Sequence, residues 1–237
     1  MIKVVLWDID GTLLSFKLAE RAAIRTCFDK FGLGEITDEM LADYSQINAR
    51  YWKRLELGEL TKQQVLRGRF EEFFTVYGLD IGCVDDFNAE YQVRLGETVV
   101  FNDNGGELVR RLRGKVKQYA VTNGTLVAQR GKLKNSGLDQ LLDGVFISDV
   151  VGVEKPGKGF FDAVFAAIGP YEPDQVLIVG DSLTSDIQGG NNAGILCCWY
   201  NPAGQEVPGH LRVDYNIRDL NELIGILGLE GQSCLIR

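Results

Sequence analysis

Residues 4–13 read Val-Val-Leu-Trp-Asp-Ile-Asp-Gly-Thr-Leu, a short apolar run followed by two acids and a glycine. A near-continuous apolar run of this length is typical of a strand buried on both faces, as in a parallel sheet. Alternation along a strand places residues two apart on the same side, so the carboxylates of Asp8 and Asp10 are expected to converge where the strand ends. Taken alone, the segment predicts either this acidic site or an ordinary polar turn at Gly11.

Three further apolar runs end in polar residues in the same manner. They occupy residues 119–121, 145–147 and 176–179. From Thr122 onward these runs alternate with helical patterns, which cover residues 126–136, 159–168 and 185–193. This order predicts the α/β class with an open, doubly wound parallel sheet, in which ligands bind beyond the carboxyl ends of the strands. Asp8, Thr122 and Asp181 each follow such an end.

The residues between the first strand and Thr122 follow a different pattern. Four amphipathic segments with helical period are broken by glycines, and they cover residues 18–31, 38–57, 62–77 and 84–95. Thr37 and Thr61 precede two of these segments and are expected N-caps. No strand pattern interrupts the segments. We therefore expect a small α-helical domain, residues 16–96, inserted into a core domain of residues 1–15 and 97–237.

Polar side chains at the predicted strand ends indicate a ligand site. Beside the two acids of the first strand, Thr122-Asn123 offers a hydroxyl and an amide, and Lys155 brings a positive charge after a later strand. Asp181 ends a buried strand, where a carboxylate without a partner is costly. Asp186 has a simpler explanation as a first-turn acid favoured by the helix dipole. Each residue has an ordinary structural explanation, but their common edge of the sheet favours a site.

Charge and composition limit the class of function. Lys and Arg number 25 against 33 Asp and Glu, which gives a formal net charge of −8. This balance disfavours a nucleic-acid polymer as partner, because binding one depends on neutralising many phosphates with basic side chains. The balance is compatible with a small phosphorylated metabolite held by a local cation. The single histidine, His210, excludes a metal site built from several imidazoles and is expected in a surface loop.

The sequence has no apolar stretch long enough to span a bilayer or to act as a secretory signal, so we expect no membrane association. The five cysteines are an odd number, scattered without a Cys-x-x-Cys pair. Reduced thiols in a cytoplasmic protein explain this pattern better than a disulfide framework. The adjacent Cys197 and Cys198 lie in an apolar run and are expected to be packing residues. No pattern indicates an oligomeric state.

The ordered motifs of the chain resemble those of a known superfamily. Together, four segments resemble the signature motifs of the haloacid dehalogenase-like (HAD) hydrolases: Asp8-x-Asp10-Gly-Thr, Thr122-Asn123, Lys155-Pro156 and Gly-Asp181-x4-Asp186. The resemblance covers essentially the whole chain. It implies a Rossmann-like core, and the expected helical insertion is similar to the small α-helical cap that closes over the substrate in one subfamily.

The resemblance implies catalytic roles for both acids of the first motif. Asp8 would be the nucleophile that forms an aspartyl-phosphate, and Asp10 would protonate the leaving oxygen and then deprotonate the attacking water. The dehalogenases of the superfamily lack an acid at the position of Asp10, since a halide needs no proton to leave. Asp10 therefore favours hydrolysis of a phosphate monoester over dehalogenation.

The same resemblance implies a Mg²⁺ cofactor and a phosphate-binding site. The metal ligands would be Asp8, the backbone carbonyl of Asp10, and Asp181, which supply the oxygen atoms that Mg²⁺ prefers. The phosphoryl oxygens would be bound by Thr122, the backbone of Asn123, and Lys155. Asp186 would have a supporting role, orienting Lys155 or a metal-bound water.

Two stretches narrow the expected substrate. Residues 47–70 and 189–202 resemble the bacterial non-canonical pyrimidine 5′-nucleotidases, which implies UMP, dUMP or dTMP as the substrate. The second stretch is also similar to the N-acylneuraminate-9-phosphatases, so a sugar-phosphate phosphatase of that kind, or a phosphoglycolate phosphatase, is the alternative. A remote alternative is a non-catalytic, phosphoryl-responsive module such as a receiver domain, which has no reason to carry a helical cap.

Five residues of the expected helical domain are candidates for substrate binding. Tyr44, Asn48 and Trp52 recur every four residues and so lie along one face of a helix, where a polar Asn between aromatics leaves room for base or sugar recognition. Such a stripe is also typical of a packing face. Phe16 and Lys17 follow the first motif, where a hinge or a substrate contact is expected.

Overall fold

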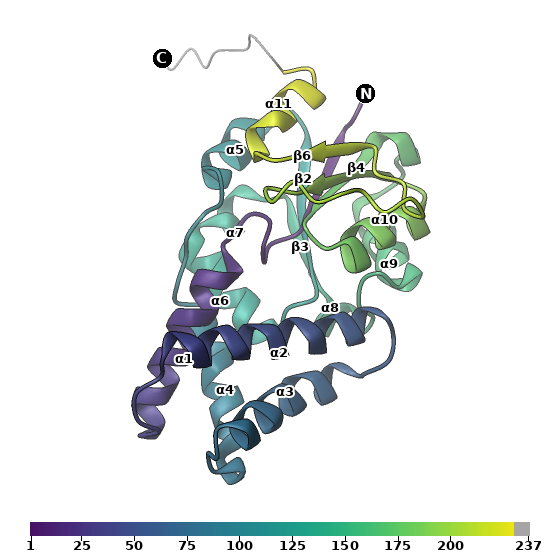
Figure 1. Cartoon of the computed structure of the whole chain (residues 1–237). Coiled ribbons are helices and arrows are strands. Elements are labelled where there is room, and N and C mark those ends of the chain that lie inside the picture. The colour runs from purple at the N-terminus through teal and green to yellow at the C-terminus, as the bar shows by residue number, and fades with distance from the viewer. Residues whose placement is uncertain (230–237) are drawn as a thin grey trace, which may run out of the picture.

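The run Val4–Trp7 forms strand β1, which lies in the middle of a parallel sheet. The computed structural model describes residues 1–229, and within them the sheet has six strands in the order β3-β2-β1-β4-β5-β6 (Figure 1). The other strands are β2 (Lys117–Thr122), β3 (Gly144–Ile147), β4 (Val176–Gly180), β5 (Leu196–Tyr200) and β6 (Tyr215–Ile217). Every neighbouring pair of these strands is parallel, so the predicted fold class is confirmed.

Strand β1 is apolar throughout because helices cover both faces of the sheet. Val5 and Trp7 pack into one hydrophobic cluster, whereas Val4 and Leu6 pack into another. The first face is covered by α5 (Gly105–Leu112), α6 (Leu126–Ser136), α7 (Leu138–Leu141) and α11 (Leu223–Ile226). The second face is covered by α8 (Ser148–Val151), α9 (Lys158–Ile168) and α10 (Gln188–Ala193).

The predicted helical segment over residues 185–193 is confirmed, but its first residues are π-helical and not α-helical. A π-helical turn, Leu183–Ile187, precedes α10, and the backbone N–H of Ile187 donates to the carbonyl of Ser182 at 3.1 Å. The N–H of Ser182 in turn donates to the carboxylate of Asp186 at 3.1 Å. This local bonding stabilises the wider turn, and such turns are frequent at functional sites. Single 3₁₀ turns cover Ile81–Cys83, Pro173–Gln175 and Leu220–Glu222.

Four longer helices lie beside the carboxyl edge of the sheet (Figure 1). They are α1 (Phe16–Phe31), α2 (Asp38–Glu56), α3 (Lys62–Val76) and α4 (Val84–Leu95). Thr37 and Thr61 cap α2 and α3 as predicted, each accepting a hydrogen bond from a backbone N–H of the first turn. The helices have a hydrophobic cluster of their own, rich in aromatic rings and separate from the two clusters of the sheet. We refer to α1–α4 as the cap.

The remaining sequence expectations concern surface and thiol residues. His210 lies in an exposed turn. Cys27, Cys197 and Cys198 are buried and, like Cys83, carry free thiols, while Cys234 lies outside the described residues. Within residues 1–229, no helix combines the length and apolar character that crossing a membrane requires.

Candidate active site

A buried lysine joins two of the predicted acids. The ammonium of Lys155 donates to Asp8 Oδ1 at 2.9 Å, to Asp186 Oδ1 at 2.7 Å and to the carbonyl of Val121 at 2.7 Å. Lys155 and Asp186 are each 1% exposed. Asp8 directly follows β1, so parallel pairing places it beside the ends of β2 and β4. The structure therefore brings three separate motifs into one charged cluster.

Asn123 fixes the backbone that carries this lysine. Its side-chain amide donates to the carbonyl of Lys155 and its oxygen accepts from the N–H of Lys155, both at 2.8 Å. The same amide lies 3.3 Å from the hydroxyl of Ser185. Thr122 accepts a hydrogen bond from the N–H of Gly124 and is itself buried. Asn123 thus holds the Lys155 loop in register with β2, while Thr122 lies at the end of that strand.

Asp181 lies so close to Gly11 of the first motif that only glycine fits at position 11. Gly11 has a φ of +96°, and a Cβ on it would lie 2.4 Å from Oδ2 of Asp181. The hydroxyl of Thr12 donates to Asp181 Oδ1 at 3.2 Å, and the Trp199 indole donates to the carbonyl of Asp181 at 3.0 Å. The glycine of the first motif therefore allows the fourth motif to approach it closely.

The crowding of these acids changes their pKa values. Burial raises the pKa of the Asp8 carboxyl to about 7; Lys155 opposes this shift and the charge of Asp186 adds to it. Desolvation by the surrounding protein and the charges of Asp8 and Asp186 likewise raise the pKa of Asp181, although part of this residue is exposed to solvent. Burial by itself lowers the pKa of Lys155, but the two carboxylates outweigh it and raise that pKa above its ordinary value. The cluster therefore has more negative charge than its single ammonium balances.

The oxygen atoms of this cluster fit a divalent cation. One carboxylate oxygen from each of Asp8, Asp181 and Asp186 lies within 4.8 Å of the others. Carboxylate oxygens are the donors that Mg²⁺ prefers, and a dication would offset the excess negative charge. Both oxygens of Asp186 already have protein partners, Lys155 and the N–H of Ser182. Asp8 and Asp181 are therefore the better placed carboxylates.

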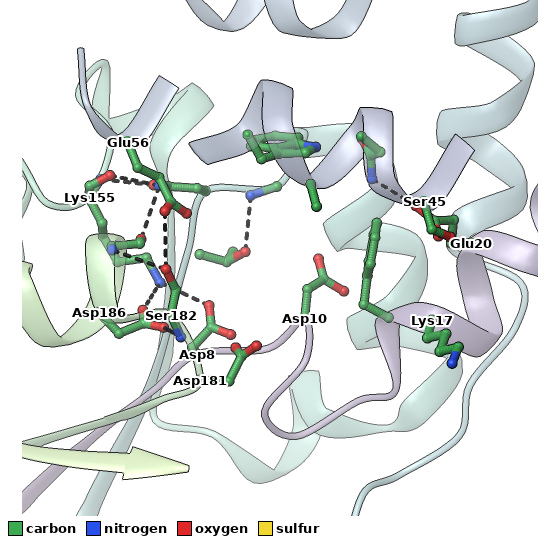
Figure 2. A pocket seen from close by; sticks show the side chains of 18 residues that line it. Asp8, Asp10, Lys17, Glu20, Ser45, Glu56, Lys155, Asp181, Ser182 and Asp186 are labelled. Atoms are coloured by element: carbon green, nitrogen blue, oxygen red, sulfur yellow. Dashed lines mark hydrogen bonds and ion pairs between the residues drawn. The ribbon is translucent and has the colours of Figure 1, made fainter. Parts of the chain in front are cut away.

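Asp10 lies apart from the Lys155 cluster (Figure 2), and it has partners of its own. The side-chain amide of Gln129 donates to Asp10 Oδ2 at 2.6 Å, and the ammonium of Lys132 forms an ion pair with Oδ1. Both partners lie on α6, directly after the second motif. The two acids of the first motif thus line one cavity but have different cationic partners.

The cavity has a volume of about 400 Å³ and lies between the core and the cap. Its core side carries the four motifs, and its cap side is formed by α1 and by one face of α2. The cap residues that line it are Phe16, Lys17, Glu20, Ser45, Asn48, Ala49, Trp52 and Glu56. The volume falls within the range of ordinary small-molecule sites.

A chain of buried polar groups forms part of the cap side. Asn48 donates to Glu20 at 2.8 Å and accepts from Arg69 at 2.8 Å, and Ser45 also donates to Glu20. Glu20, Asn48 and Arg69 are all at most 3% exposed. Burial raises the pKa of Glu20 above its ordinary value, while Ser45 and Asn48 oppose the shift. This end of the cavity therefore offers fixed hydrogen-bonding groups to a ligand.

The candidate substrate residues of α2 need one correction. Asn48 and Trp52 line the cavity, as do Phe16 and Lys17 from α1. Tyr44 does not: it is fully buried in the aromatic core of the cap, stacked on Phe70 at 5.0 Å between ring centroids. Positions four apart on an α-helix advance by about 40°, so the stripe turns from the packing face at residue 44 to the cavity face at residue 52.

Several residues in or beside the cavity were not indicated by any sequence motif. Gln129 and Lys132 lie three apart on the helix after the second motif, a spacing that places both on one helical face. Glu20 stands out only as the one acid among otherwise apolar residues on the buried face of α1. Glu56 joins the cap to the core by accepting hydrogen bonds from Ser182 and Thr184. Its partners are more than 120 residues away, beyond the reach of local pattern.

Known proteins resemble this chain over nearly its whole length. A family model described as haloacid dehalogenase-like hydrolase matches residues 2–194. The HAD-hydrolase YfnB of Bacillus subtilis is 35% identical, covering 98% of both chains. The pyrimidine 5′-nucleotidase PynA of Streptococcus pneumoniae is 34% identical, covering 95% of this chain and 94% of its own. The pyrimidine 5′-nucleotidase YjjG of Escherichia coli is 30% identical, covering 94% and 96%.

A solved structure matches the fold described above. The crystal structure of Bacillus subtilis YfnB bound to magnesium superposes with a TM-score of 0.88 at 34% identity. It covers 95% of this chain and 98% of its own, and its description reports interdomain movement. The likeness therefore extends over both the sheet and the cap.

Proposed function

The chain belongs to the haloacid dehalogenase-like hydrolases, and from that premise we propose that it is a Mg²⁺-dependent phosphatase of pyrimidine nucleoside 5′-monophosphates. The observation that carries the proposal is the pair of acids in one cavity, Asp8 beside Lys155 and Asp10 beside Lys132. Two acids in separate environments can take separate roles, one as nucleophile and one as proton carrier.

In the first step, a carboxylate oxygen of Asp8 attacks phosphorus and the ester oxygen leaves. Asp10 gives its proton to that oxygen, because an alkoxide is a poor leaving group without one. The products of this step are the nucleoside and an aspartyl-phosphate on Asp8. Lys155, held by Asn123, lies beside Asp8 and stabilises the charge that develops on the phosphoryl oxygens.

In the second step, water attacks the phosphorus of the aspartyl-phosphate. Asp10, now a carboxylate, takes a proton from that water, and the bond between phosphorus and Asp8 breaks. Thr122 and the backbone of Asn123 complete the set of groups proposed to bind the phosphoryl oxygens. A Mg²⁺ ion held by Asp8, Asp181 and the backbone carbonyl of Asp10 would neutralise charge between the anionic nucleophile and the anionic substrate.

The cap side of the cavity supports a nucleoside as the leaving group. Phe16 and Trp52 supply aromatic faces, and Asn48 and Glu20 supply polar groups that are already fixed by hydrogen bonds. A planar base with a polar edge matches this combination. The names of the two nucleotidase relatives support the same substrate class. A cytoplasmic setting is part of the proposal, supported by the free thiols of Cys27, Cys83, Cys197 and Cys198.

A substrate panel tests the proposal. Phosphate release is measured with Mg²⁺ for UMP, dUMP and dTMP, and for phosphoglycolate, glyceraldehyde 3-phosphate and N-acylneuraminate 9-phosphate. The expected result is the highest kcat/KM for the pyrimidine nucleotides and loss of activity in EDTA. A sugar phosphate or phosphoglycolate in first place would contradict the substrate, and full activity in EDTA would contradict the metal. Stable phosphate retention without turnover would favour the phosphoryl-responsive module.

A further inference from the structure

Lys132 is a buried lysine that the four motifs do not include. It is 1% exposed, and among residues 1–229 Asp10 is the only carboxylate within ion-pair distance of its ammonium. The ammonium also lies over the ring of Phe16, 5.1 Å from the ring centroid. Burying a lysine is costly unless a partner compensates. The carboxylate that compensates the buried charge of Lys132 belongs to Asp10.

Gln129 makes a second contact of the same kind. Its side chain is fully buried, and its amide donates to the other oxygen of Asp10 at 2.6 Å. Within the described residues, the carbonyl oxygen of this side chain has no hydrogen-bond partner, so Asp10 is its polar anchor. The Gln129 amide packs directly against Gly124, because a Cβ on Gly124 would lie 2.1 Å from Nε2 of Gln129. The glycine of the second motif thus makes room for this contact.

The helix that carries both residues is tied to the cap. Thr125, the N-cap of α6, donates to Gln92 of α4 at 2.7 Å, and Asn135 of α6 donates to the carbonyl of Gly96 at 2.8 Å. A Cβ on Gly131 would lie 2.9 Å from the Cα of Gly96, so the two backbones are in close contact. Helix α6 is therefore a rigid base for the two side chains that reach Asp10.

We propose that Lys132 and Gln129 are positioning residues for Asp10 in both proton transfers. This inference rests on the proposed phosphatase function. Each donor fixes one carboxyl oxygen, which sets the orientation of the group that gives its proton to the leaving oxygen. When Asp10 has lost that proton, the ammonium of Lys132 stabilises the carboxylate that remains. The same carboxylate then takes the proton of the attacking water, so both steps depend on the two donors.

The variant Lys132→Met separates these steps when two substrates are compared. A nucleotide such as dTMP needs a proton on its leaving oxygen, whereas p-nitrophenolate leaves without one. With dTMP, the variant should lose roughly ten- to a hundredfold in kcat, less than the full contribution of about 10²–10⁴-fold from a general acid or base, because Asp10 itself remains. With p-nitrophenyl phosphate, the first step should survive while the second is slowed. Acid-quenched mass spectrometry should then show more aspartyl-phosphate than in the wild type, with a matching burst of p-nitrophenol.

Further variants separate positioning from a structural role. Gln129→Met leaves Lys132 in place and should accumulate the same intermediate, and Lys132→Arg should restore part of the turnover of dTMP. Lys134→Met is the control, because it removes an exposed lysine of the same helix, α6, that does not contact Asp10. This control should not accumulate the intermediate.

The outcomes distinguish this inference from the proposed function. Inactivity of the wild-type chain on every phosphate monoester would overturn both. An active wild type, with Lys132→Met and Gln129→Met losing activity equally on both substrates and accumulating no aspartyl-phosphate, would overturn the inference alone. Accumulation in the Lys134→Met control as well would also overturn it, since the effect would then not depend on Asp10.

Discussion

At the scale of single residues, the site depends on acids that are close together but differently partnered. Asp8 lies beside Lys155, Asp10 beside Lys132, and Asp181 beside the small hydroxyl of Thr12. Asp181 is also the most solvent-exposed of these acids, and it lines the cavity. A cation that enters the site would therefore find Asp181 available for coordination.

Magnesium should stabilise the folded chain, and Asp181→Asn should remove most of that effect. At one hundred times its Kd, a ligand that binds only the folded state adds about 2.7 kcal/mol. For a chain of this length, that stabilisation raises Tm by several degrees. Differential scanning fluorimetry with and without Mg²⁺ measures the shift. An equal Mg²⁺ shift in the variant would contradict the assignment of Asp181 as a ligand.

The motif residues could be predicted from sequence, and their partners could not. Asp8, Thr122 and Asp181 follow strand ends, and parallel strands bring those ends to one edge whatever the intervening chain. Lys155 reaches the same edge from the loop after α8. Gln129 and Lys132 lie on an ordinary helix, where the residue that each one faces depends on how α6 packs. The role of Asn123 as a clamp on Lys155 depends equally on loop geometry that spacing does not supply.

At the scale of elements, helix α2 is the clearest case of one segment serving two purposes. One side of it packs Tyr44 into the cap, and the adjoining side presents Asn48 and Trp52 to the cavity. The repeating pattern predicted the helix, since its bounds agree with the predicted segment to within one residue. The pattern did not predict which residues of α2 face the cap core and which face the cavity, because this depends on the orientation of the helix against its neighbours.

Removal of the Trp52 ring should weaken binding of nucleotides selectively. In Trp52→Ala, KM for UMP and dTMP should rise by roughly tenfold, as expected for loss of about 1–3 kcal/mol of base stacking. KM for a small alkyl phosphate without a ring should change little. Lys53→Ala is the control, since Lys53 is the next residue of α2 and is exposed. An equal rise in KM for both substrates would contradict a role of Trp52 in base recognition.

At the scale of the whole molecule, the cap and the core have separate hydrophobic clusters and meet partly through polar contacts. Glu56 of α2 accepts from Ser182 and Thr184, and Lys62 of α3 pairs with Asp149. Polar contacts of this kind exchange with water at modest cost, so they suit a boundary that opens for substrate and closes over it. The net charge of −8 matters less than this local arrangement, because the phosphate of the proposed substrate would meet the residues that line the cavity.

The boundary contact of Glu56 should make stability depend on pH. Burial raises the pKa of Glu56 above its ordinary value, although Thr184 and Ser182 oppose the shift. An acid whose folded pKa is raised costs no stability below its unfolded pKa, and the cost grows as pH rises from there through the folded pKa. The wild type should therefore lose stability over that pH range, whereas Glu56→Gln should not. The difference in free energy of unfolding, variant minus wild type, should increase as pH rises. Urea denaturation of both proteins at several pH values measures this difference. A decrease of the difference with rising pH would contradict the raised pKa of Glu56.

The inserted position of the cap was visible in the sequence, and its contacts with the core were not. Helical period over residues 16–96, between two strand patterns, predicted four helices, and α1–α4 lie within those bounds. The contacts at the boundary join residues that are distant in sequence, such as Glu56 and Ser182. They arise only after the cap folds against the sheet, so no local period or spacing encodes them.

Rapid acid quenching followed by peptide mass spectrometry tests whether Asp8 is the nucleophile of a phosphatase. The wild-type chain is mixed with dTMP and Mg²⁺, quenched during turnover and mapped for phosphorylation, beside Asp8→Asn. We expect a phosphoryl group on the peptide that contains Asp8 in the wild type, and neither that group nor turnover in the variant. Turnover of dTMP by Asp8→Asn near the wild-type rate would contradict it.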